Sequence, residues 1–237
     1  MIGIDRHKKN MMHGVHALPK QYTHWLVKFS NMQDGDDAGA IEYVYSLMAH
    51  AAGVLMSDTH LFPAKKCVGY FATQRFDRIN NKRLHAHTAC GLLHSDFRSP
   101  ALDYLDLLSL TEMLTRDVRE VEKMFRQAVF NVLSHNRDDH AKNFSFLMNE
   151  WGEWKLSPAY DLTFSSGPGG EQSTMVLGNG KNITIDHLIE LGLRAKLDNA
   201  VIKNSIDQTR HALSQWKMLA KQYGVTHENI NHIQKLF

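Results

Sequence analysis

The polar segment at residues 135–143 holds the side chains best suited to chemistry in this chain of 237 residues. Its nine residues include two His, two Asp, one Arg, one Lys and two Asn, and such a composition cannot form a core. It also suits a solvated loop between a helix and a strand. Strongly apolar stretches flank the segment on both sides, however, and this favours a site held on a rigid frame.

Two carboxylates and an amide have a spacing that is suited to phosphoryl transfer. Asp138 and Asn143 form the pattern D-x-x-x-x-N, in which one carboxylate faces the attacking hydroxyl while the Asn oxygen reaches a magnesium ion. Asp161 follows a short strand, where a carboxylate can chelate the magnesium ions on ATP phosphates. A lone Asp after a strand is usually a turn residue, but a strand pair after Asn143 would bring Asp161 back towards Asp138.

Such a site also needs a cation for the α and β phosphates, and Lys28 is the candidate. It lies in an apolar run, where a charge is out of place, although an exposed strand residue is the simpler interpretation. Glu42 lies in the next expected helix and could pair with Lys28 and orient it.

The elements that must position these residues fall into two parts. The first, residues 1–78, reads as strands at 24–29, 54–62 and 67–76 around one helix from Ala38 that stops at Gly53, with a turn at 34–37. The second, residues 79–237, is mainly helical. Its elements are a short apolar segment at 87–94, helices at 104–114 and 117–133, strands at 144–148 and 154–156, an exposed glycine-rich loop at 165–170, and helices from 186 that break near Gly192 and Gly224. The change of periodicity predicts a two-lobed α+β fold.

Composition limits the class of protein. Hydrophobic residues make up 43% and charged residues 22%, as in folded globular proteins. No apolar run is long enough for a bilayer, and the N-terminus has no apolar core of signal-peptide length. Two cysteines fit a reducing compartment, so we expect a cytoplasmic protein without membrane contact. A net charge of +2 argues against strong direct binding of nucleic acid.

Five segments together resemble the HipA-type serine/threonine-protein kinase toxins of bacteria. They are NRDDHAKNFSFL at 136–147, LSPAYDL at 156–162, THWLVKF at 23–29, IEY at 41–43 and QRFDR at 74–78, and they cover nearly the whole chain in the right order. The resemblance implies a divergent protein-kinase-like fold with a small strand-rich N-lobe, a larger helical C-lobe, and ATP with Mg²⁺ between them. It also implies transfer of the ATP γ-phosphate to a Ser or Thr of a protein substrate.

The resemblance also assigns roles to individual residues. Asp138 would be the catalytic base, and Asn143 and Asp161 would be the magnesium ligands. The remaining residues expected at the nucleotide are Lys28 on the phosphates with Glu42 in support, His140 and Lys142 near the triphosphate, Tyr160, and a hinge of Gln74, Arg75 and Phe76 against the adenine.

One departure from the family concerns the phosphate loop. Members carry a glycine-rich, serine-containing loop before the first strand, whereas this chain starts at Met1-Ile2-Gly3-Ile4-Asp5, which resembles the strand after that loop. The segment at 13–16 has one glycine and no serine, so it is no substitute. We therefore expect a shortened member that lacks the small N-terminal subdomain and is weak or inactive as a kinase alone. Its expected partners are a small DNA-binding helix-turn-helix antitoxin and a separately encoded N-terminal subdomain.

Two other classes of function stay open. A metal-dependent phosphohydrolase could use His135, Asp138, Asp139 and His140, with His87 and His94 in addition, but it gives no role to Lys28, Asn143 or Asp161. A non-catalytic remnant that only binds an antitoxin partner is the other possibility.

Overall fold

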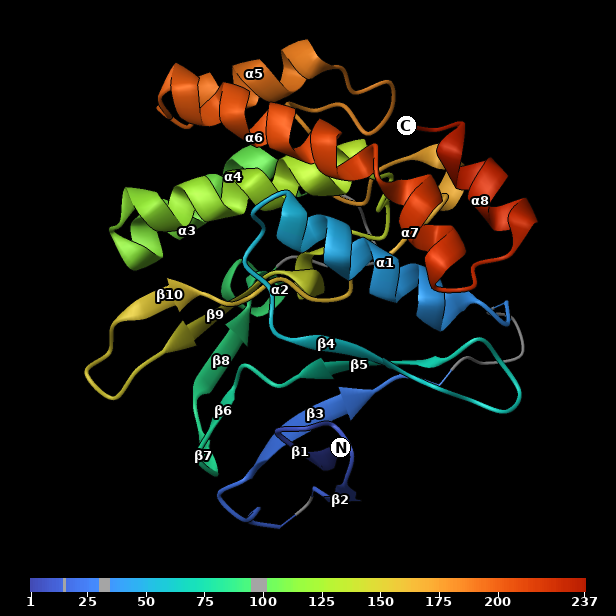
Figure 1. Cartoon of the computed structure of the whole chain (residues 1–237). Coiled ribbons are helices and arrows are strands. Elements are labelled where there is room, and N and C mark those ends of the chain that lie inside the picture. Colours follow the sequence, from blue (N-terminus) through green and yellow to red (C-terminus); the bar gives the residue numbers. More distant parts are fainter. Residues whose placement is uncertain (15, 30–34, 95–101) are drawn as a thin grey trace.

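The computed structural model describes residues 1–14, 16–29, 35–94 and 102–237. It has a twisted sheet at one end and a helical body at the other, with one long helix between them (Figure 1). This arrangement confirms the predicted two-lobed α+β class. Part of the predicted turn at 34–37 lies outside the described residues.

The first sheet has five antiparallel strands in the order β2-β1-β3-β5-β4. Their bounds are β1 (Ile2–Asp5), β2 (Met11–His13), β3 (Tyr22–Val27), β4 (Thr59–Phe62) and β5 (Tyr70–Gln74). The predicted strands at 54–62 and 67–76 are therefore real but shorter than expected. The register pairs Trp25 of β3 with Gln74 of β5, so the middle of β3 lies beside the start of the expected hinge.

A second, three-stranded sheet lies against the helical body in the order β10-β9-β8. Its strands are β8 (His85–Thr88), β9 (Ser145–Met148) and β10 (Trp154–Leu156), and a separate hairpin joins β6 (Arg78–Ile79) to β7 (Lys82–Arg83). The two later strands match the prediction, whereas β8 was not predicted. The sheet fixes the direction in which the chain leaves residues 135–143, because β9 begins two residues later.

The helical body is built around α4, which contacts α3, α6 and β10. The helices are α1 (Ala38–Ala51), α2 (Ala89–Leu92), α3 (Tyr104–Thr115), α4 (Val118–Leu133), α5 (Ile185–Arg194), α6 (Asn199–Leu213), α7 (Trp216–Gln222) and α8 (His227–Gln234). Asp103 and Asp106 form a capping box on α3, and Asp117 accepts from the backbone N–H of Arg119 at the start of α4. No helix of the described residues is long and apolar enough to cross a membrane.

The predicted break near Gly192 falls three residues later, between α5 and α6 at residues 195–198. Gly192 itself lies inside α5, which continues to Arg194. A Cβ at Gly192 would lie 2.6 Å from Ile202 Cγ1, so this glycine lets α5 and α6 pack closely. The break near Gly224 is confirmed, because α7 ends at Gln222 and α8 begins at His227.

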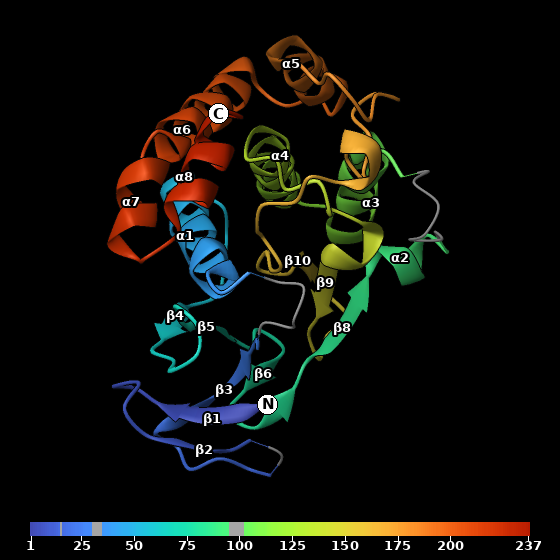
Figure 2. The same cartoon turned by 90° about the vertical axis from the view of Figure 1, so that its right-hand side faces the viewer.

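The core of α1 belongs to the helical body rather than to the sheet alone. Buried residues of α1, including Tyr45 and Met48, share one hydrophobic cluster with Trp216 of α7. The sheet has its own small cluster, consisting of Ile4, Trp25, Phe62 and Ala72. Polar contacts add to this attachment: the buried carboxylate of Asp37 accepts from Thr226 N at 2.8 Å and from Asn229 Nδ2 at 2.9 Å. Figure 2 shows α1 lying alongside α6, α7 and α8.

Candidate active site

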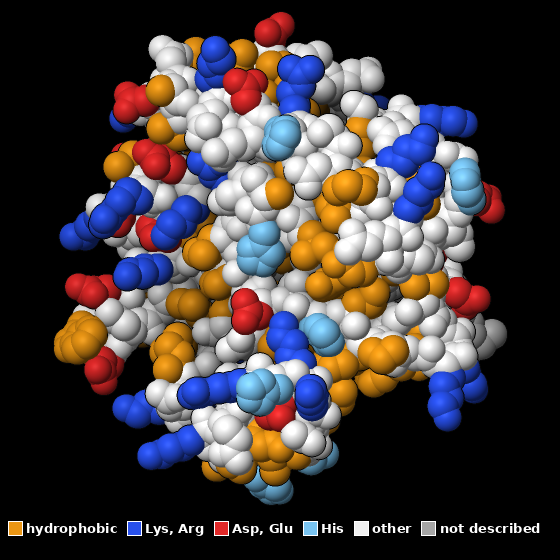
Figure 3. Space-filling view, in the orientation of Figure 1, with side chains coloured by type: hydrophobic (Ala, Val, Ile, Leu, Met, Phe, Trp, Pro, Cys, Tyr) orange, Lys and Arg blue, Asp and Glu red, His pale blue; other side chains and the backbone are white. Residues whose placement is uncertain are grey.

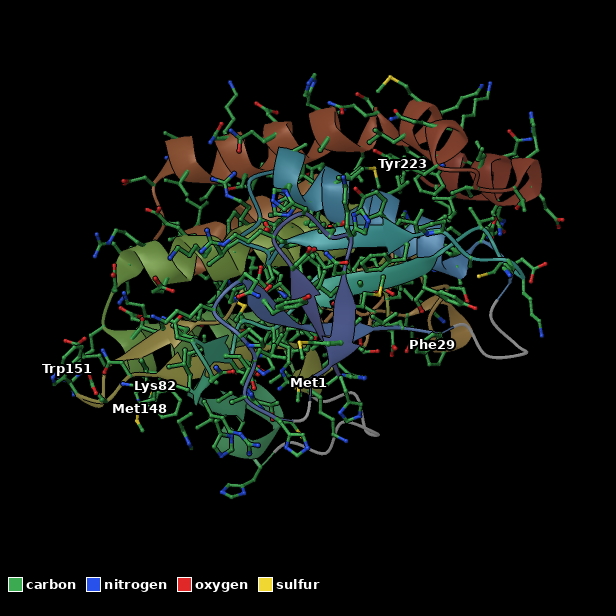
Figure 4. The ribbon with its side chains drawn as sticks, turned by 60° about the horizontal axis from the view of Figure 1, so that its bottom comes forward. Met1, Phe29, Lys82, Met148, Trp151 and Tyr223 are labelled. Atoms are coloured by element: carbon green, nitrogen blue, oxygen red, sulfur yellow. The ribbon has the colours of Figure 1, made fainter. Side chains whose placement is uncertain are left out.

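Three elements distant in sequence meet at the side chain of Lys28. Lys28 directly follows β3, and its backbone N–H donates to Phe71 O of β5 at 2.9 Å. Its ammonium donates to Glu42 Oε1 of α1 at 2.7 Å and also to the carboxylate of Asp161, which follows β10. We call Lys28, Glu42 and Asp161 the ion-pair cluster. Phe29, the next residue, packs edge-to-face on Tyr70 at the rim of the sheet (Figure 4).

Charge and burial act against each other in this cluster. Burial alone would lower the pKa of Lys28, but the charges of Glu42 and Asp161 outweigh burial and raise it. Glu42 is buried, and burial raises its pKa to about 7 despite the neighbouring ammonium. The Lys28 and Asp161 side chains are 44% and 42% exposed, so an incoming anion or cation can reach them.

The backbone around Asp161 is held from the side of the sheet. Ala159 N donates to Leu55 O at 2.7 Å, next to a parallel bridge between Met56 and Ala159. Asp161 itself has φ of 60°, a left-handed conformation that costs about 1 kcal/mol or more in a non-glycine residue. Such strain persists only where the surroundings determine it, and here it aims the carboxylate at Lys28.

Residues 135–143 form a tight loop that ends in a single 3-10 turn at Ala141–Asn143. The buried Asn143 uses its side-chain nitrogen to donate to Asp138 O at 2.8 Å, and its carbonyl oxygen takes no part in that bond. Asp138 is exposed at the surface of the loop, and Lys142 is exposed while His140 is half-buried.

Tyr160 connects this loop to the ion-pair cluster. Its hydroxyl donates to Lys142 O at 2.5 Å and lies 2.6 Å from Ser145 Oγ. Because Tyr160 precedes Asp161 and Lys142 precedes Asn143, a short run of contacts leads from Lys28 to Asp138. Lys28, Asp161, Asn143 and Asp138 are thus brought into one region.

The expected hinge residues lie on the strand side of this region. Gln74 N donates to Asp58 O and Arg75 N donates to His24 O, each at 2.8 Å. The Arg75 guanidinium donates two hydrogen bonds to the carboxylate of Asp77, two residues further along the chain. The ring of Phe76 is 5.6 Å from that of Tyr160, and this contact links the hinge with the Asp161 segment.

Sequence reasoning missed a set of buried polar residues behind the loop. Asp139 is fully buried and accepts from Tyr104 Oη at 2.5 Å, Gln172 Nε2 at 2.9 Å and Thr174 N at 3.1 Å. Asn131 of α4 donates to Tyr104 Oη at 3.0 Å. We call these five residues the buried network. Burial raises the pKa of Asp139 to about 6, although its hydrogen bonds act in the opposite direction.

One signal for this network was present in the sequence. Asn131 is a polar residue among the mainly apolar buried residues of α4, and such a residue needs a hydrogen-bonding partner inside the protein.

The oxygen atoms available as metal ligands in this region suit a hard cation better than a transition metal. Among the described residues, no three His, Cys, Asp or Glu side chains are grouped to hold a metal ion. The four-residue set considered for a hydrolase does not converge, since Asp139 faces the interior and His135 Nε2 lies 2.8 Å from Leu236 O. The Asn143 carbonyl and the Asp161 carboxylate are oxygen donors, and magnesium on a nucleotide needs only one or two of these from the protein.

The fold and the site define a kinase-like protein, and similarity to known proteins makes this assignment more specific. Residues 4–216 match the family model of the HipA-like C-terminal domain, so the chain belongs to this family. The structure resembles HipA of a Shewanella oneidensis toxin–antitoxin system, solved in a complex with HipB and operator DNA, with a TM-score of 0.70 and 15% identity over 99% of this chain. It also resembles the Helicobacter pylori proinflammatory kinase CtkA, with a TM-score of 0.51 and 14% identity over 88% of this chain.

The relatives differ in how much of their own length is matched. Y4mE of Sinorhizobium fredii, a candidate kinase, is 25% identical in an alignment of 185 residues that covers 69% of this chain. The chain spans 43% of the length of Y4mE, 60% of the HipA chain and 91% of the CtkA chain.

Proposed function

We propose that the chain carries the site of a serine/threonine-protein kinase that transfers the ATP γ-phosphoryl group to a hydroxyl of a protein in the cytoplasm, and that this activity is weak without the phosphate loop of the family. The observation that carries this proposal is the double ion pair of Lys28 with Glu42 and Asp161. A lysine held on a strand by a helix glutamate, beside an aspartate, is the arrangement with which kinases fix the phosphates and the metal. Membership of the HipA-like family supports it.

In this proposal each side chain has one task. Asp138 accepts the proton of the attacking hydroxyl, and its exposed position leaves room for a protein substrate. When the nucleotide binds, the Lys28 ammonium exchanges its contact with Asp161 for the nucleotide phosphates. Glu42 keeps the Lys28 ammonium in place. Asn143 and Asp161 supply oxygen ligands for magnesium. Bound magnesium would supply positive charge next to the transferring phosphoryl group.

The nucleotide lies between the lobes in this proposal, with residues 1–78 as N-lobe and 79–237 as C-lobe. Gln74, Arg75 and Phe76 border the adenine, and His140 and Lys142 approach the triphosphate. Tyr160 fixes the spacing between Lys142 and Asp161 through its bond to Lys142 O. The solved HipA complex contains HipB and operator DNA, and on this likeness we propose a small DNA-binding antitoxin as partner.

A titration of ATP with and without magnesium tests the proposal. Wild-type protein should bind ATP more tightly with magnesium, and Asp161→Ala should remove that dependence. Asp186→Ala is the matched control, because Asp186 is exposed in the first turn of α5. Radiolabelled transfer from ATP to proteins of a cell extract then reports catalysis, which Asp138→Ala should abolish. Magnesium-dependent binding that persists in Asp161→Ala would refute the assigned site.

A further inference from the structure

A second polar cavity lies beside residues 135–137 and away from the ion-pair cluster. It has a volume of about 920 Å³ and is bordered by the loop at 170–183, by α6 and by the end of α8. Neither Lys28, Asp138, Asn143 nor Asp161 contributes to its wall. Figure 2 shows the elements that border it, namely α6, α8 and the loop that leads into α5. The proposed phosphoryl-transfer site therefore leaves this cavity unexplained.

Basic side chains outnumber acidic ones in the wall of the cavity. Arg137, Lys181 and Arg210 are cations and His211 also lines it, whereas Asp207 is its one acidic residue. Burial and the neighbouring Arg137 lower the pKa of His135, so this ring is a neutral part of the wall. Lys181 pairs with Glu171 at 3.1 Å. Arg210 has no ion pair within the described residues. A concave surface with an excess of one sign of charge concentrates the opposite sign at its mouth. On the face seen in Figure 3, by contrast, acidic and basic side chains are interspersed.

Arg137 is fixed in this wall by neutral partners. Its guanidinium donates to Ser166 O at 3.1 Å and lies 3.1 Å from His135 Nδ1. Gly167, with φ of 66°, makes room for it, because a Cβ there would lie 2.8 Å from Arg137 Cβ. No carboxylate of the described residues pairs with this guanidinium, whose planar donors suit carboxylate or phosphate oxygens.

We propose that this cavity binds an anionic segment of a polypeptide. Its volume lies at the upper end of the range for ligand sites and exceeds what one small anion needs. Apolar side chains such as Leu213 and Leu236 share the wall with the cations, which suits a peptide that carries both apolar and acidic groups. Carboxylate and phosphoryl groups have the chemistry required of the anion.

The bound polypeptide is the protein substrate, and this part of the inference rests on the proposed function. Arg137 precedes Asp138 directly in the chain. A substrate anchored at Arg137 is therefore held close to the residue that takes the hydroxyl proton. The cavity would act as a docking site that raises the local concentration of the substrate at Asp138.

Binding of labelled peptides tests the site without any need for catalysis. Fluorescence anisotropy of the whole chain would be measured with a glutamate-rich, a phosphoserine-containing and a lysine-rich peptide. The first two should bind, and Arg210→Glu combined with Lys181→Glu should weaken them at least about tenfold. Lys203→Glu, an exposed change on α6 outside the cavity, should leave binding within about twofold. The stronger of the two anionic peptides identifies the preferred source of charge.

Three results would overturn the proposal. The first is equal binding of all three peptides, and the second is an equal loss of binding in the Lys203→Glu control. The third is displacement of the acidic peptide by inorganic phosphate or by ATP at similar concentrations, which would make the cavity a site for small anions.

Kinetics separate this proposal from the proposed function. With dephosphorylated casein as acidic substrate, Arg210→Glu should raise KM several-fold and leave kcat within about twofold. If the wild type binds the peptides but transfers no phosphate to any protein, the proposed function fails and the cavity stands. If transfer occurs and neither peptide binding nor KM responds to Arg210→Glu, the cavity proposal fails and the function stands.

Discussion

Asp138 and Asp139 are neighbours in sequence, yet Asp138 lies in a solvent-exposed region and Asp139 in a buried, hydrogen-bonded one. On one side, the side chains of Lys28, Asp161 and Asp138 are accessible to solvent, so ligands can replace their contacts. On the other, the buried network surrounds Asp139 with donors from α3 and from residues 172–174. Side chains of the first region can exchange partners during a reaction. A group of the second region that loses its partner stays without a hydrogen bond, because water does not reach it. Two adjacent residues of the loop thus differ in role: Asp138 is the proposed general base, and Asp139 holds the fold together.

The largest effect should come from removing the exposed carboxylate. Under the proposed function, Asp138→Ala loses the general base, and phosphoryl transfer should fall about 10³-fold. The free energy of unfolding should stay within about 0.5 kcal/mol, because Asp138 is at the surface. Initial rates with radiolabelled ATP and urea unfolding measure the two quantities. A stable Asp138→Ala protein with near-normal rates would show that the base lies elsewhere.

The opposite result is expected one residue later. Asp139→Ala leaves the Tyr104 hydroxyl and the Thr174 N–H buried without their acceptor, which should cost about 3 kcal/mol of unfolding free energy. Urea unfolding of Asp139→Ala against Asp138→Ala measures the contrast. Equal stabilities of the two variants would break the distinction between the two regions.

The pH dependence of stability should sharpen the contrast. The pKa of Asp139 is raised to about 6 in the folded protein, so between about pH 4 and pH 6 the folded state binds more protons than the unfolded state. Stability from this group is therefore present at low pH and lost as pH rises through that window. The free-energy difference between wild type and Asp139→Asn should fall by about 2 kcal/mol from pH 4 to pH 7. A flat difference would mean that Asp139 is charged throughout.

The smallest effect should come from Glu42→Gln, which removes one of the two ion pairs of Lys28. In Glu42→Gln, Lys28 keeps Asp161 but loses its buried carboxylate partner. ATP affinity should drop about tenfold, because the ammonium is no longer held towards the phosphates. Glu112→Gln, an exposed change on α3, serves as control in the same calorimetric titration. Unchanged affinity in Glu42→Gln would leave Glu42 with a packing role only.

Local patterns in the sequence predicted the elements whose signal is local. The apolar period of α4 and the stop at Gly53, which has φ of 74°, were visible because one helix face and one backbone angle determine them. Strand β8 was missed, because His85 and His87 give no apolar alternation and the strand forms by pairing with β9. The break near Gly192 was predicted a few residues early, because the glycine serves the close approach of Ile202 within α5 rather than the end of the helix.

The residues of the site also divide into those that the sequence predicted and those that only long-range packing determines. Family resemblance singled out Lys28, Glu42 and Asp161, and the structure brings their side chains together. Nothing in an Asp-Asp pair says which carboxylate is buried. That choice is made by Tyr104, 35 residues away, and by residues that follow the glycine-rich loop. Long-range packing, which no local pattern encodes, decides it.

The attachment of α1 has a mechanical consequence. Glu42 sits on a helix whose buried face and Asp37 cap are tied to the helical body, while Lys28 extends from the sheet. A tilt of the sheet over the body would therefore change the distance between the Lys28 ammonium and the Glu42 carboxylate, which is 2.7 Å in this structure. The length of this ion pair would report how the sheet is placed on the helical body.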